Sequence, residues 1–328
     1  MAGIKLTRSK KNPLLKPIRR RKHLWWESGS VFNPGVVVKG RRIYLLYRAI
    51  GGIHYSHFGL AILKDPTTII KRFSLPVLEP EPGNDLERFG VEDPRIVFLD
   101  NKFQIIYTAA SIYSAIREVP GKYGRMIVPW KVRCSLVVTS DFRKYERKGV
   151  ILPGIDSKDG TLFPAKINDQ YVLLHRPFPD IWISFSPQIT EFGSGKVLCR
   201  PRSDTWDNDR IGAGAPPLKT PLGWLEFYHG IYNSPGKPLQ YMMGILLLDL
   251  ENPTKILYRS QEPVLVPEEP YEKKGYIRNV VFGCGAIEWK EAYYLYYGAA
   301  DKVIGVASIP KDELLSYLAQ AVKKGAAA

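Results

Sequence analysis

One aspartate of the sequence combines features that suit a general acid. Asp93 lies in the run VEDPR, between Glu92 and Pro94. A proline restricts the residue before it, so we expect extended backbone geometry at Asp93. The like charge of Glu92 would raise the proton affinity of Asp93, as donation of a proton to a leaving group requires. A structural alternative stays open, in which an Asp-Pro turn pairs Asp93 with Arg95.

Basic residues elsewhere in the chain suit the binding of a dianion such as phosphate. Three cations and an imidazole form this set: Lys158, Arg176, Arg210 and His229. Such side chains recognise phosphate through charge-assisted hydrogen bonds. Each residue alone is as well explained by a salt bridge at the surface or a strand end. The Walker, GxGxxG, GxSxG and HExxH motifs do not occur, so nucleotide-binding folds, serine hydrolases and zincins gain no support.

The chain repeats a pattern of a short apolar strand, a tight polar turn and an aromatic-rich strand. Five segments carry it: residues 31–48, 91–108, 160–176, 211–230 and 280–298. Their second strands end at comparable points, namely Tyr47, Tyr107, His175, Tyr228 and Tyr297. The spacing leaves room for two more strands in each unit, such as residues 132–139, 181–186 and 241–250. The repeat therefore predicts an all-β fold, a five-bladed β-propeller, with an irregular β-sandwich as the alternative.

A propeller brings residues at equivalent repeat positions together at one mouth of its channel. The polar residues at these positions are Asn33, Arg48, Glu92, Asp93, Lys158, Asp159, Arg176, Asp209, Arg210, His229, Arg278, Asn279 and Asp301. A ring of charges with a purely structural role would be costly, because buried charges must be paired. These positions are therefore the candidates for a functional site.

The positive charge is concentrated at the N-terminus. The 328 residues carry a formal charge of +15, and residues 1–26 hold nine basic side chains and no acidic one. We therefore expect a basic N-terminal arm (1–26), a propeller domain (27–309) and a short C-terminal helix with a tail (310–328), the last from its amphipathic spacing. The arm suits a polyanion or a solvated segment packed over the body. We favour the solvated arm, since no nucleic-acid-binding motif accompanies it.

Composition also limits which cellular compartments and binding partners we expect for the protein. No run of about 18 apolar residues could span a membrane, and no secretory signal is visible. The three cysteines, Cys134, Cys199 and Cys284, are far apart and odd in number. This fits a reducing compartment and argues against zinc. We expect a cytoplasmic protein with no membrane partner and no metal.

Several of these segments resemble glycoside hydrolase family 130. The resemblance is carried, in order, by NPGVVVKGRRIYLLYRAIG, GVEDPRIVFLDNKF, KDGTLFPAKINDQYVLLHRP, DRIGAGAPP and NVVFGCGA, and it covers about residues 30–308. It implies a five-bladed β-propeller and the activity of an inverting β-mannoside phosphorylase. Some members of the family are instead β-1,2-mannosidases. Because members often form oligomers, the resemblance also makes a homo-oligomer a candidate.

The resemblance implies a role for each residue that matches the family's motifs. Asp93 matches the proton-donating aspartate. The implied phosphate set is Lys158, Arg176, Arg210, His229 and Tyr241, and the implied mannosyl set is Asn33, Arg48, Glu92 and Asp301. The chain has Lys158, Arg210 and Glu92 where many mannosyl-glucose phosphorylases have Arg, Lys and Tyr. It looks more like the branch that acts on β-1,2-mannosides or manno-oligosaccharides.

The expected reaction needs no cofactor, only inorganic phosphate as co-substrate. Phosphate would attack the anomeric carbon of a β-mannoside, linked β-1,2 or β-1,4, and release α-mannose 1-phosphate. Inverting hydrolases need a second carboxylate to activate water, whereas phosphate is already an anion. The alternatives are a β-mannosidase on the same fold and a non-catalytic propeller that binds polyanions through the arm.

Overall fold

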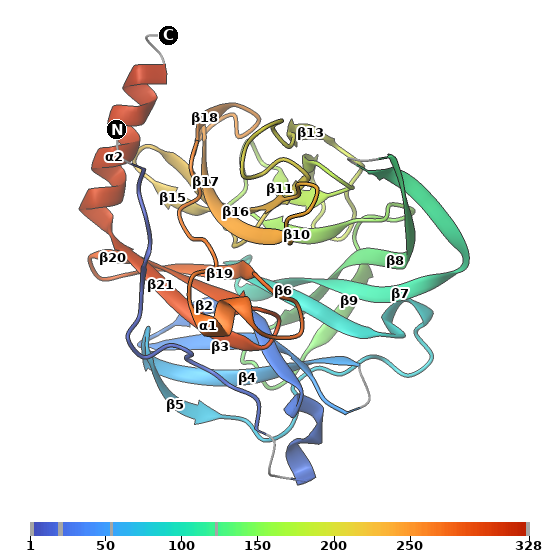
Figure 1. The fold of residues 1–328 in the computed structure, drawn as a ribbon. Helices are drawn as coiled ribbons and strands as arrows, with labels where there is room; N and C mark the ends of the chain where they lie inside the picture. Colours follow the sequence, from blue (N-terminus) through green and yellow to red (C-terminus); the bar gives the residue numbers. More distant parts are fainter. Residues whose placement is uncertain (1–2, 19–21, 53–54, 122–123, 326–328) are drawn as a thin grey trace.

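Antiparallel strands form nearly all the regular structure of the chain (Figure 1). The computed structural model describes residues 3–18, 22–52, 55–121 and 124–325, with the backbone alone for 22–24, 115–121, 124–129 and 325. Within these ranges the α-helices are α1 (Pro270–Lys273) and α2 (Lys311–Gly325), and the 3₁₀ helices are η1 (Lys22–Glu27) and η2 (Asp85–Glu87). No described helix is long and apolar enough to cross a bilayer. The all-β prediction is confirmed.

Two four-stranded runs follow each other in the first part of the chain. Their strands are β2 (Ser30–Lys39), β3 (Arg42–Ile50), β4 (Ser56–Asp65) and β5 (Thr68–Arg72), then β6 (Gly90–Leu99), β7 (Lys102–Gly121), β8 (Gly124–Thr139) and β9 (Glu146–Val150). Each strand pairs antiparallel with the next within its run. One parallel pair, Ser56 with Gly90, joins the two runs. The long β7–β8 hairpin stands away from the body (Figure 1).

Three further sheets complete the chain. The first holds β10 (Lys158–Leu162), β11 (Tyr171–Arg176), β12 (Ile181–Ser186) and β13 (Lys196–Cys199). The second holds β14 (Arg210–Gly212), β15 (Leu218–Thr220), β16 (Gly223–Tyr232), β17 (Gln240–Leu248) and β18 (Ile256–Arg259). The third holds β19 (Val281–Trp289), β20 (Ala292–Ala299), β21 (Val303–Pro310) and β1 (Thr7–Arg8). The strands expected at residues 132–139, 181–186 and 241–250 are found in β8, β12 and β17.

The N-terminal segment is part of the last sheet. Thr7 and Arg8 of β1 pair with Ser308 and Ala307 of β21. Ile4, Leu6 and Leu15 are buried. Figure 1 shows the segment running beside α2 and β21. The favoured expectation of an arm packed over the body thus agrees with residues 3–18, although strand pairing and apolar burial hold them more closely than a solvated segment. Arg19–Arg21 lie outside the described residues.

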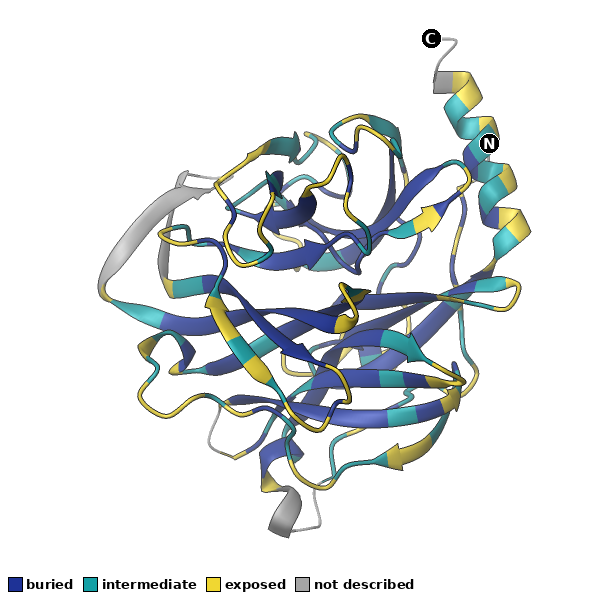
Figure 2. Cartoon of the chain, turned by 180° about the vertical axis from the view of Figure 1, so that it is seen from behind, coloured by how far each residue is buried: buried dark blue, intermediate teal, exposed yellow. Residues whose placement is uncertain are grey.

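The hydrophobic core lies between successive sheets. Apolar side chains of β3 and β4 pack against β6 and β7, those of β7 and β8 against β10 and β11, and those of β11 and β12 against β16 and β17. The last sheet in turn packs on the first, through residues such as Tyr296, Ile304 and Val31. Figure 2 shows these strands buried along most of their length, with exposure at turns and at one face of α2. Leu314 and Leu318 anchor that helix and are fully buried.

One set of contacts, made by a buried acid, a tyrosine and an arginine, recurs along the chain. Each tyrosine in it is one of those that mark the sequence repeat. Tyr47, Tyr107, Tyr228 and Tyr297 donate hydrogen bonds to Glu27, Glu87, Asp207 and Glu272, respectively. Each acid also pairs with an arginine of the outermost strand, namely Arg72, Arg147, Arg259 and Arg8. In the β10–β13 sheet His175 takes the tyrosine position and contacts Ser157 and Ser184. We call the four sets that contain a tyrosine the acid–Tyr–Arg triads.

Candidate functional site

Three first strands carry a polar residue in left-handed backbone geometry at the same place. Asn33, Asp93 and Asp159 have φ of 47°, 52° and 57°. The pairing registers of β2, β6 and β10 all shift at these residues. A bulge redirects a side chain, and Asp and Asn tolerate the left-handed region better than other non-glycine residues. The repeat therefore presents an amide and two carboxylates at equivalent points.

Asp93 does not have the extended geometry expected from its proline. The bulge in β6 requires a left-handed residue at this point, and its φ of 52° satisfies that requirement. The side chain is only 6% exposed. Asn33 Nδ2 donates to Asp93 Oδ1 at 2.8 Å, and Arg48 Nη1 lies 3.3 Å from the same oxygen. Both contacts fall on Oδ1, so Oδ2 is the oxygen suited to carry a proton.

Two further carboxylates gather around Arg48. Arg48 Nη2 pairs with Glu92 Oε1 at 2.5 Å, and its Nε donates to Ser56 Oγ at 2.8 Å. Burial raises the pKa of Glu92. Burial also raises the pKa of Asp301 to about 6, although the positive charge of Arg48 opposes this shift. The residues proposed for a mannosyl unit are thus brought together around Asp93.

Asp159 is the centre of a second, cationic cluster. Its carboxylate is fully buried. Arg176 Nε lies 2.7 Å from Oδ2, and His229 Nε2 lies 3.5 Å from the same atom. These neighbours, with Arg95, overcome the effect of burial and lower the pKa of Asp159. Sequence reasoning placed Asp159 among the polar repeat positions but gave it no role; its signal was the position that it shares with Asp93.

His229 is a neutral imidazole inside this cluster. Burial lowers its pKa well below the usual value, and the positive charges of Arg176 and Arg95 add to the shift. Among the described residues neither ring nitrogen has a hydrogen-bond partner. Such a buried imidazole can donate one hydrogen bond and accept another. It is therefore suited to contact a ligand oxygen.

Arg95 joins the two clusters and was missed as a site residue. Its Nη1 donates to the backbone oxygen of Asp93 at 2.8 Å, and its Nη2 donates to Asp159 Oδ1 at 3.2 Å. Its Nε donates to the oxygen of Gly214 at 3.0 Å. Within the described residues the ion-pair partner of the Asp93 carboxylate is Arg48, whereas Arg95 contacts the Asp93 main chain. The available signal was a cation in the middle of β6, directly before the apolar run IVFL.

The positive charge of Lys158 influences the protonation of residues in both clusters. Its positive charge favours the ionised carboxylates of Glu92 and Asp301 on one side. On the other side it favours ionised Asp159 and disfavours protonated His229. Lys158 also pairs in register with Arg176 across β10 and β11. The acidic and cationic clusters thus face a common region.

Arg210 and Tyr241 lie in the adjoining sheet. Arg210 Nη2 donates to Tyr241 Oη at 3.1 Å, and its Nη1 pairs with Asp209. Within the described residues no hydrogen bond links Arg210 directly to Asp159, Arg176 or His229. Arg210 is connected to the cationic cluster through its own strand, β14, in which Gly212 pairs with His229. Arg278, by contrast, is exposed.

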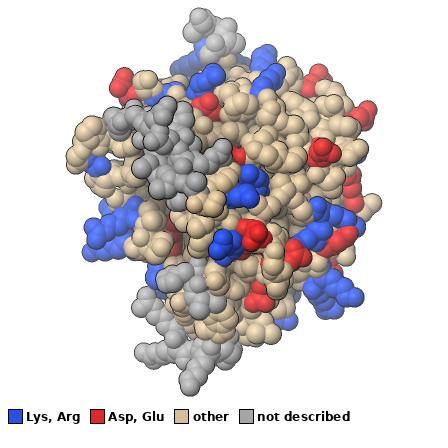
Figure 3. All heavy atoms as spheres, turned by 90° about the vertical axis from the view of Figure 1, so that its right-hand side faces the viewer, with Lys and Arg blue, Asp and Glu red and all other residues tan. Residues whose placement is uncertain are grey.

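Over the described ranges no three His, Cys, Asp or Glu side chains are placed to hold a metal ion. On the face shown in Figure 3, basic and acidic side chains are interspersed. The acidic cluster can donate a proton, and the cationic cluster beside it is suited to bind an anion.

Comparison with known proteins agrees with this chemistry. The family model of glycoside hydrolase family 130, described as beta-1,4-mannooligosaccharide phosphorylase, matches residues 6–320. The chain is 38% identical to a 1,2-beta-oligomannan phosphorylase of Thermoanaerobacter sp. (strain X514), over 95% of this chain and 99% of that protein. It is 37% identical to a beta-1,2-mannobiose phosphorylase of the same organism, over 94% and 99%. The solved beta-1,2-mannobiose phosphorylase of Listeria innocua, in complex with beta-1,2-mannobiose, superposes with a TM-score of 0.79 at 29% identity, covering 95% of this chain and 99% of that one.

Proposed function

Because the chain belongs to glycoside hydrolase family 130, we propose that it is an inverting phosphorylase of β-1,2-linked manno-oligosaccharides. Phosphate attacks the anomeric carbon of the terminal β-mannosyl unit and releases α-mannose 1-phosphate and a shortened sugar. The β-1,2 linkage is supported by the two relatives of that specificity at 38% and 37% identity.

Asp93 is the proton donor in this proposal. Its Oδ1 is held by Asn33 and Arg48, which leaves Oδ2 for the proton. The family resemblance routes the proton to the leaving oxygen through the mannose 3-hydroxyl. Arg48, Asn33, Glu92 and Asp301 bind the mannosyl unit, because carboxylate, amide and guanidinium groups together satisfy sugar hydroxyls.

The phosphate lies against Lys158, Arg176, Arg210, His229 and Tyr241. Arg176 uses Nε for Asp159, so its terminal nitrogens are the ones that meet phosphate oxygens. Neutral His229 donates a hydrogen bond without adding charge. The observation that carries the proposal is the joining of Asp93 to this cationic cluster through Arg95. No water-activating carboxylate is required, since phosphate is itself the nucleophile.

We also propose a five-bladed β-propeller, with residues 27–309 as its catalytic domain. The support is that four-stranded sheets pack in chain order and that the last packs on the first. Residues 1–26 and 310–328 flank this domain, and a homo-oligomer remains a candidate. The three cysteines are free and buried, which supports a reducing compartment such as the cytoplasm.

The test is product analysis with and without phosphate. The purified protein is incubated with β-1,2-mannobiose or β-1,4-mannobiose, and ¹H and ³¹P NMR follow the products. We expect α-mannose 1-phosphate from the β-1,2 substrate, and only when phosphate is present. Free mannose released at the same rate without phosphate would identify a hydrolase instead.

The proton donor is tested in the same assay. Asp93→Asn keeps the shape of the side chain and its left-handed geometry but removes the acid. We expect kcat to fall by about 10²–10⁴-fold. The matched control is Asp204→Asn, which changes an exposed aspartate with φ of 60° and should leave kcat unchanged. A loss below tenfold in Asp93→Asn would exclude Asp93 as the acid.

A further inference from the structure

Asp93 and Asp159 occupy equivalent bulges but have different surroundings. Asp93 is held by Asn33 and Arg48 near the other carboxylates. Asp159 is fully buried and meets Arg95, Arg176 and His229. Two like groups in unlike environments take different roles. Since the ionised carboxylate of Asp159 would repel a phosphate dianion, any role that it has in phosphate binding must pass through its cationic and imidazole neighbours.

We infer that Asp159 is a positioning residue that orients Arg176 and His229 for phosphate and, through Arg95, fixes the main chain at Asp93. This inference rests on the proposed function. Oδ2 faces Arg176 and His229, whereas Oδ1 accepts from Arg95. One buried carboxylate therefore sets both the direction of the phosphate-binding arginine and the place of the acid.

The geometry of Arg176 supports the first half of this inference. Its side chain is 7% exposed, and the ion pair with Asp159 engages Nε. A guanidinium fixed at Nε presents its two terminal nitrogens in one direction, which suits bidentate recognition of phosphate. Without a negative Asp159, the positive charges of Arg95, Arg176 and Lys158 would repel one another here, and Arg176 would swing toward solvent.

The contacts of Arg95 support the second half. This residue is 1% exposed, and its donors reach the Asp93 oxygen, Asp159 and the Gly214 oxygen. These three acceptors belong to β6, β10 and the segment after β14. A buried guanidinium with this many satisfied donors is held in one position. A shift of Asp159 would therefore be transmitted to the backbone at Asp93.

Asp159 is not one of the acids that the fold repeats. The acid–Tyr–Arg triads use Glu27, Glu87, Asp207 and Glu272, and the β10–β13 sheet has His175 with Ser157 in their place. Asp207 offers a matched comparison, because it is a fully buried aspartate that pairs with two arginines. Its partners Arg202 and Arg259 are not among the proposed phosphate ligands.

The experiment compares Asp159→Asn with Asp207→Asn in the full-length enzyme. Initial rates are measured as phosphate and β-1,2-mannobiose are varied separately, together with the melting temperature. We expect Asp159→Asn to raise the KM for phosphate about tenfold or more while the KM for mannobiose changes less than about twofold. Asp207→Asn should lower the melting temperature and leave the KM for phosphate within about twofold.

A double variant tests whether Asp159 acts through Arg176. On the Arg176→Ala background, Asp159→Asn should raise the KM for phosphate by a smaller factor than it does in the wild type, because only His229 is left for it to orient. Effects that multiply in the double variant would overturn the inference. A KM for phosphate in Asp159→Asn that matches Asp207→Asn would overturn it as well.

A second variant covers the case in which Asp159→Asn does not fold. A Cβ at Gly212 would lie 2.4 Å from His229 Cε1 and 2.6 Å from Asp159 Oδ2, so Gly212→Ala disturbs the pair without removing a charge. It should raise the KM for phosphate at least about fivefold, whereas Gly193→Ala, where the space is open, should not. An unchanged KM in Gly212→Ala would contradict the inference. Failure of the proposed function is distinct, since the wild-type enzyme would then show no phosphate dependence.

Discussion

At the scale of the residue, Asp301 is a carboxylate of the acidic cluster whose surroundings raise its pKa. It lies in left-handed geometry in the β20–β21 turn, with φ of 50°. Burial and the negative charges of Asp93 and Glu92 disfavour its ionised form, so its pKa rises to about 6. Below this pH the carboxyl is neutral, and it loses both its charge attraction for Arg48 and part of its capacity to accept hydrogen bonds.

We therefore predict that the KM for the mannoside rises as the pH falls from 7 to 5. In Asp301→Asn the side chain no longer titrates, so the KM should be higher than in the wild type at pH 7 and nearly constant over this range. Initial rates at saturating phosphate measure the effect. Asp204→Asn serves as the control and should keep the wild-type pH profile. A wild-type pH dependence that persists in Asp301→Asn would assign the titration to another group.

The sequence predicted part of this site but not its geometry. Residue types and repeat positions were sufficient to gather Asp93, Arg48 and Arg176 in one region. The left-handed backbone at Asp93 was not predictable from its proline, because a bulge in the pairing of β6 with β7 decides it. Asp159 was passed over because a single aspartate in KDG does not show that two arginines will meet it.

At the scale of the element, glycines allow neighbouring strands to approach the site closely. Gly298 in β20 lies against Asn33, and a Cβ at that position would be 2.0 Å from Asn33 Oδ1. Asn33 is itself buried and donates to Asp93. The strand packing at Gly298 thus fixes the amide that holds the proposed acid.

Gly298→Ala should therefore impair catalysis without removing a polar group. The added methyl group displaces Asn33 from Asp93 Oδ1, and we expect kcat to fall about tenfold or more while the protein remains folded. Steady-state kinetics and circular dichroism test this prediction. Gly193→Ala, which meets open space, is the control. Wild-type kcat in Gly298→Ala would show that the Asn33 contact is dispensable.

The acid–Tyr–Arg triads explain why a tyrosine marks four of the five repeat units. The tyrosine occupies a fixed place at the end of a strand, so its spacing marks each unit. The acids come from the segments before the sheets, such as η1 for Glu27 and α1 for Glu272. Their spacing to the tyrosine varies with the length of the connection. Hydrophobic periodicity carries no information on that length, and the acids could not be assigned from the sequence.

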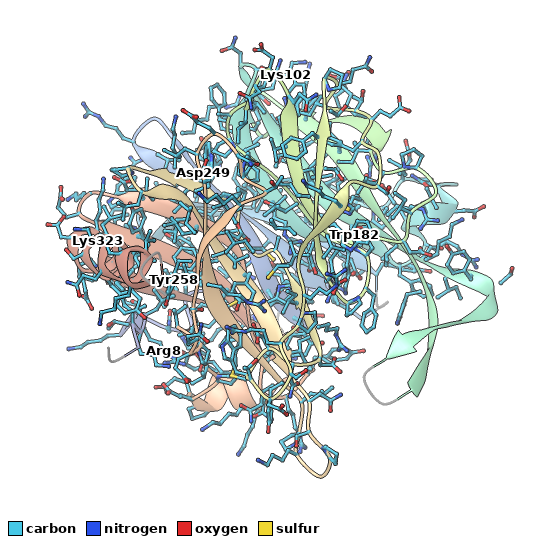
Figure 4. The ribbon with its side chains drawn as sticks, turned by 90° about the horizontal axis from the view of Figure 1, so that it is seen from above. Arg8, Lys102, Trp182, Asp249, Tyr258 and Lys323 are labelled. Atoms are coloured by element: carbon cyan, nitrogen blue, oxygen red, sulfur yellow. The ribbon has the colours of Figure 1, made fainter. Side chains whose placement is uncertain are left out.

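At the scale of the whole molecule, the N-terminal strand completes the last sheet. Arg8 of β1 occupies the place that Arg72, Arg147 and Arg259 hold in their own sheets. Lys5 also donates to the oxygen of Pro263 at 2.6 Å. Figure 4 shows Arg8 on the side of the molecule where Lys323 of α2 lies, opposite the β7–β8 hairpin. The pairing joins residues about 300 positions apart, which local sequence patterns cannot predict.

Charge alone suggested that this segment serves a polyanion, whereas its contacts predict a role in stability. Arg8 Nε lies 2.8 Å from the fully buried Glu272. Arg8→Ala would leave that carboxylate buried without its cation, at a cost of about 3 kcal/mol. We predict a melting temperature lower by several degrees, while the KM for phosphate and for mannoside at 25 °C stay within about twofold.

Lys10→Ala removes an exposed charge of the same segment, and it is the control for Arg8→Ala. Its melting temperature should equal that of the wild type. The double variant Arg8→Ala with Glu272→Gln should recover part of the loss, because no unpaired charge remains in the sheet. Equal melting temperatures for Arg8→Ala and Lys10→Ala would mean that the first strand is attached to the last sheet by its backbone alone. A loss confined to Arg8→Ala would instead show that the ion pair with Glu272 helps to hold the first strand on the last sheet.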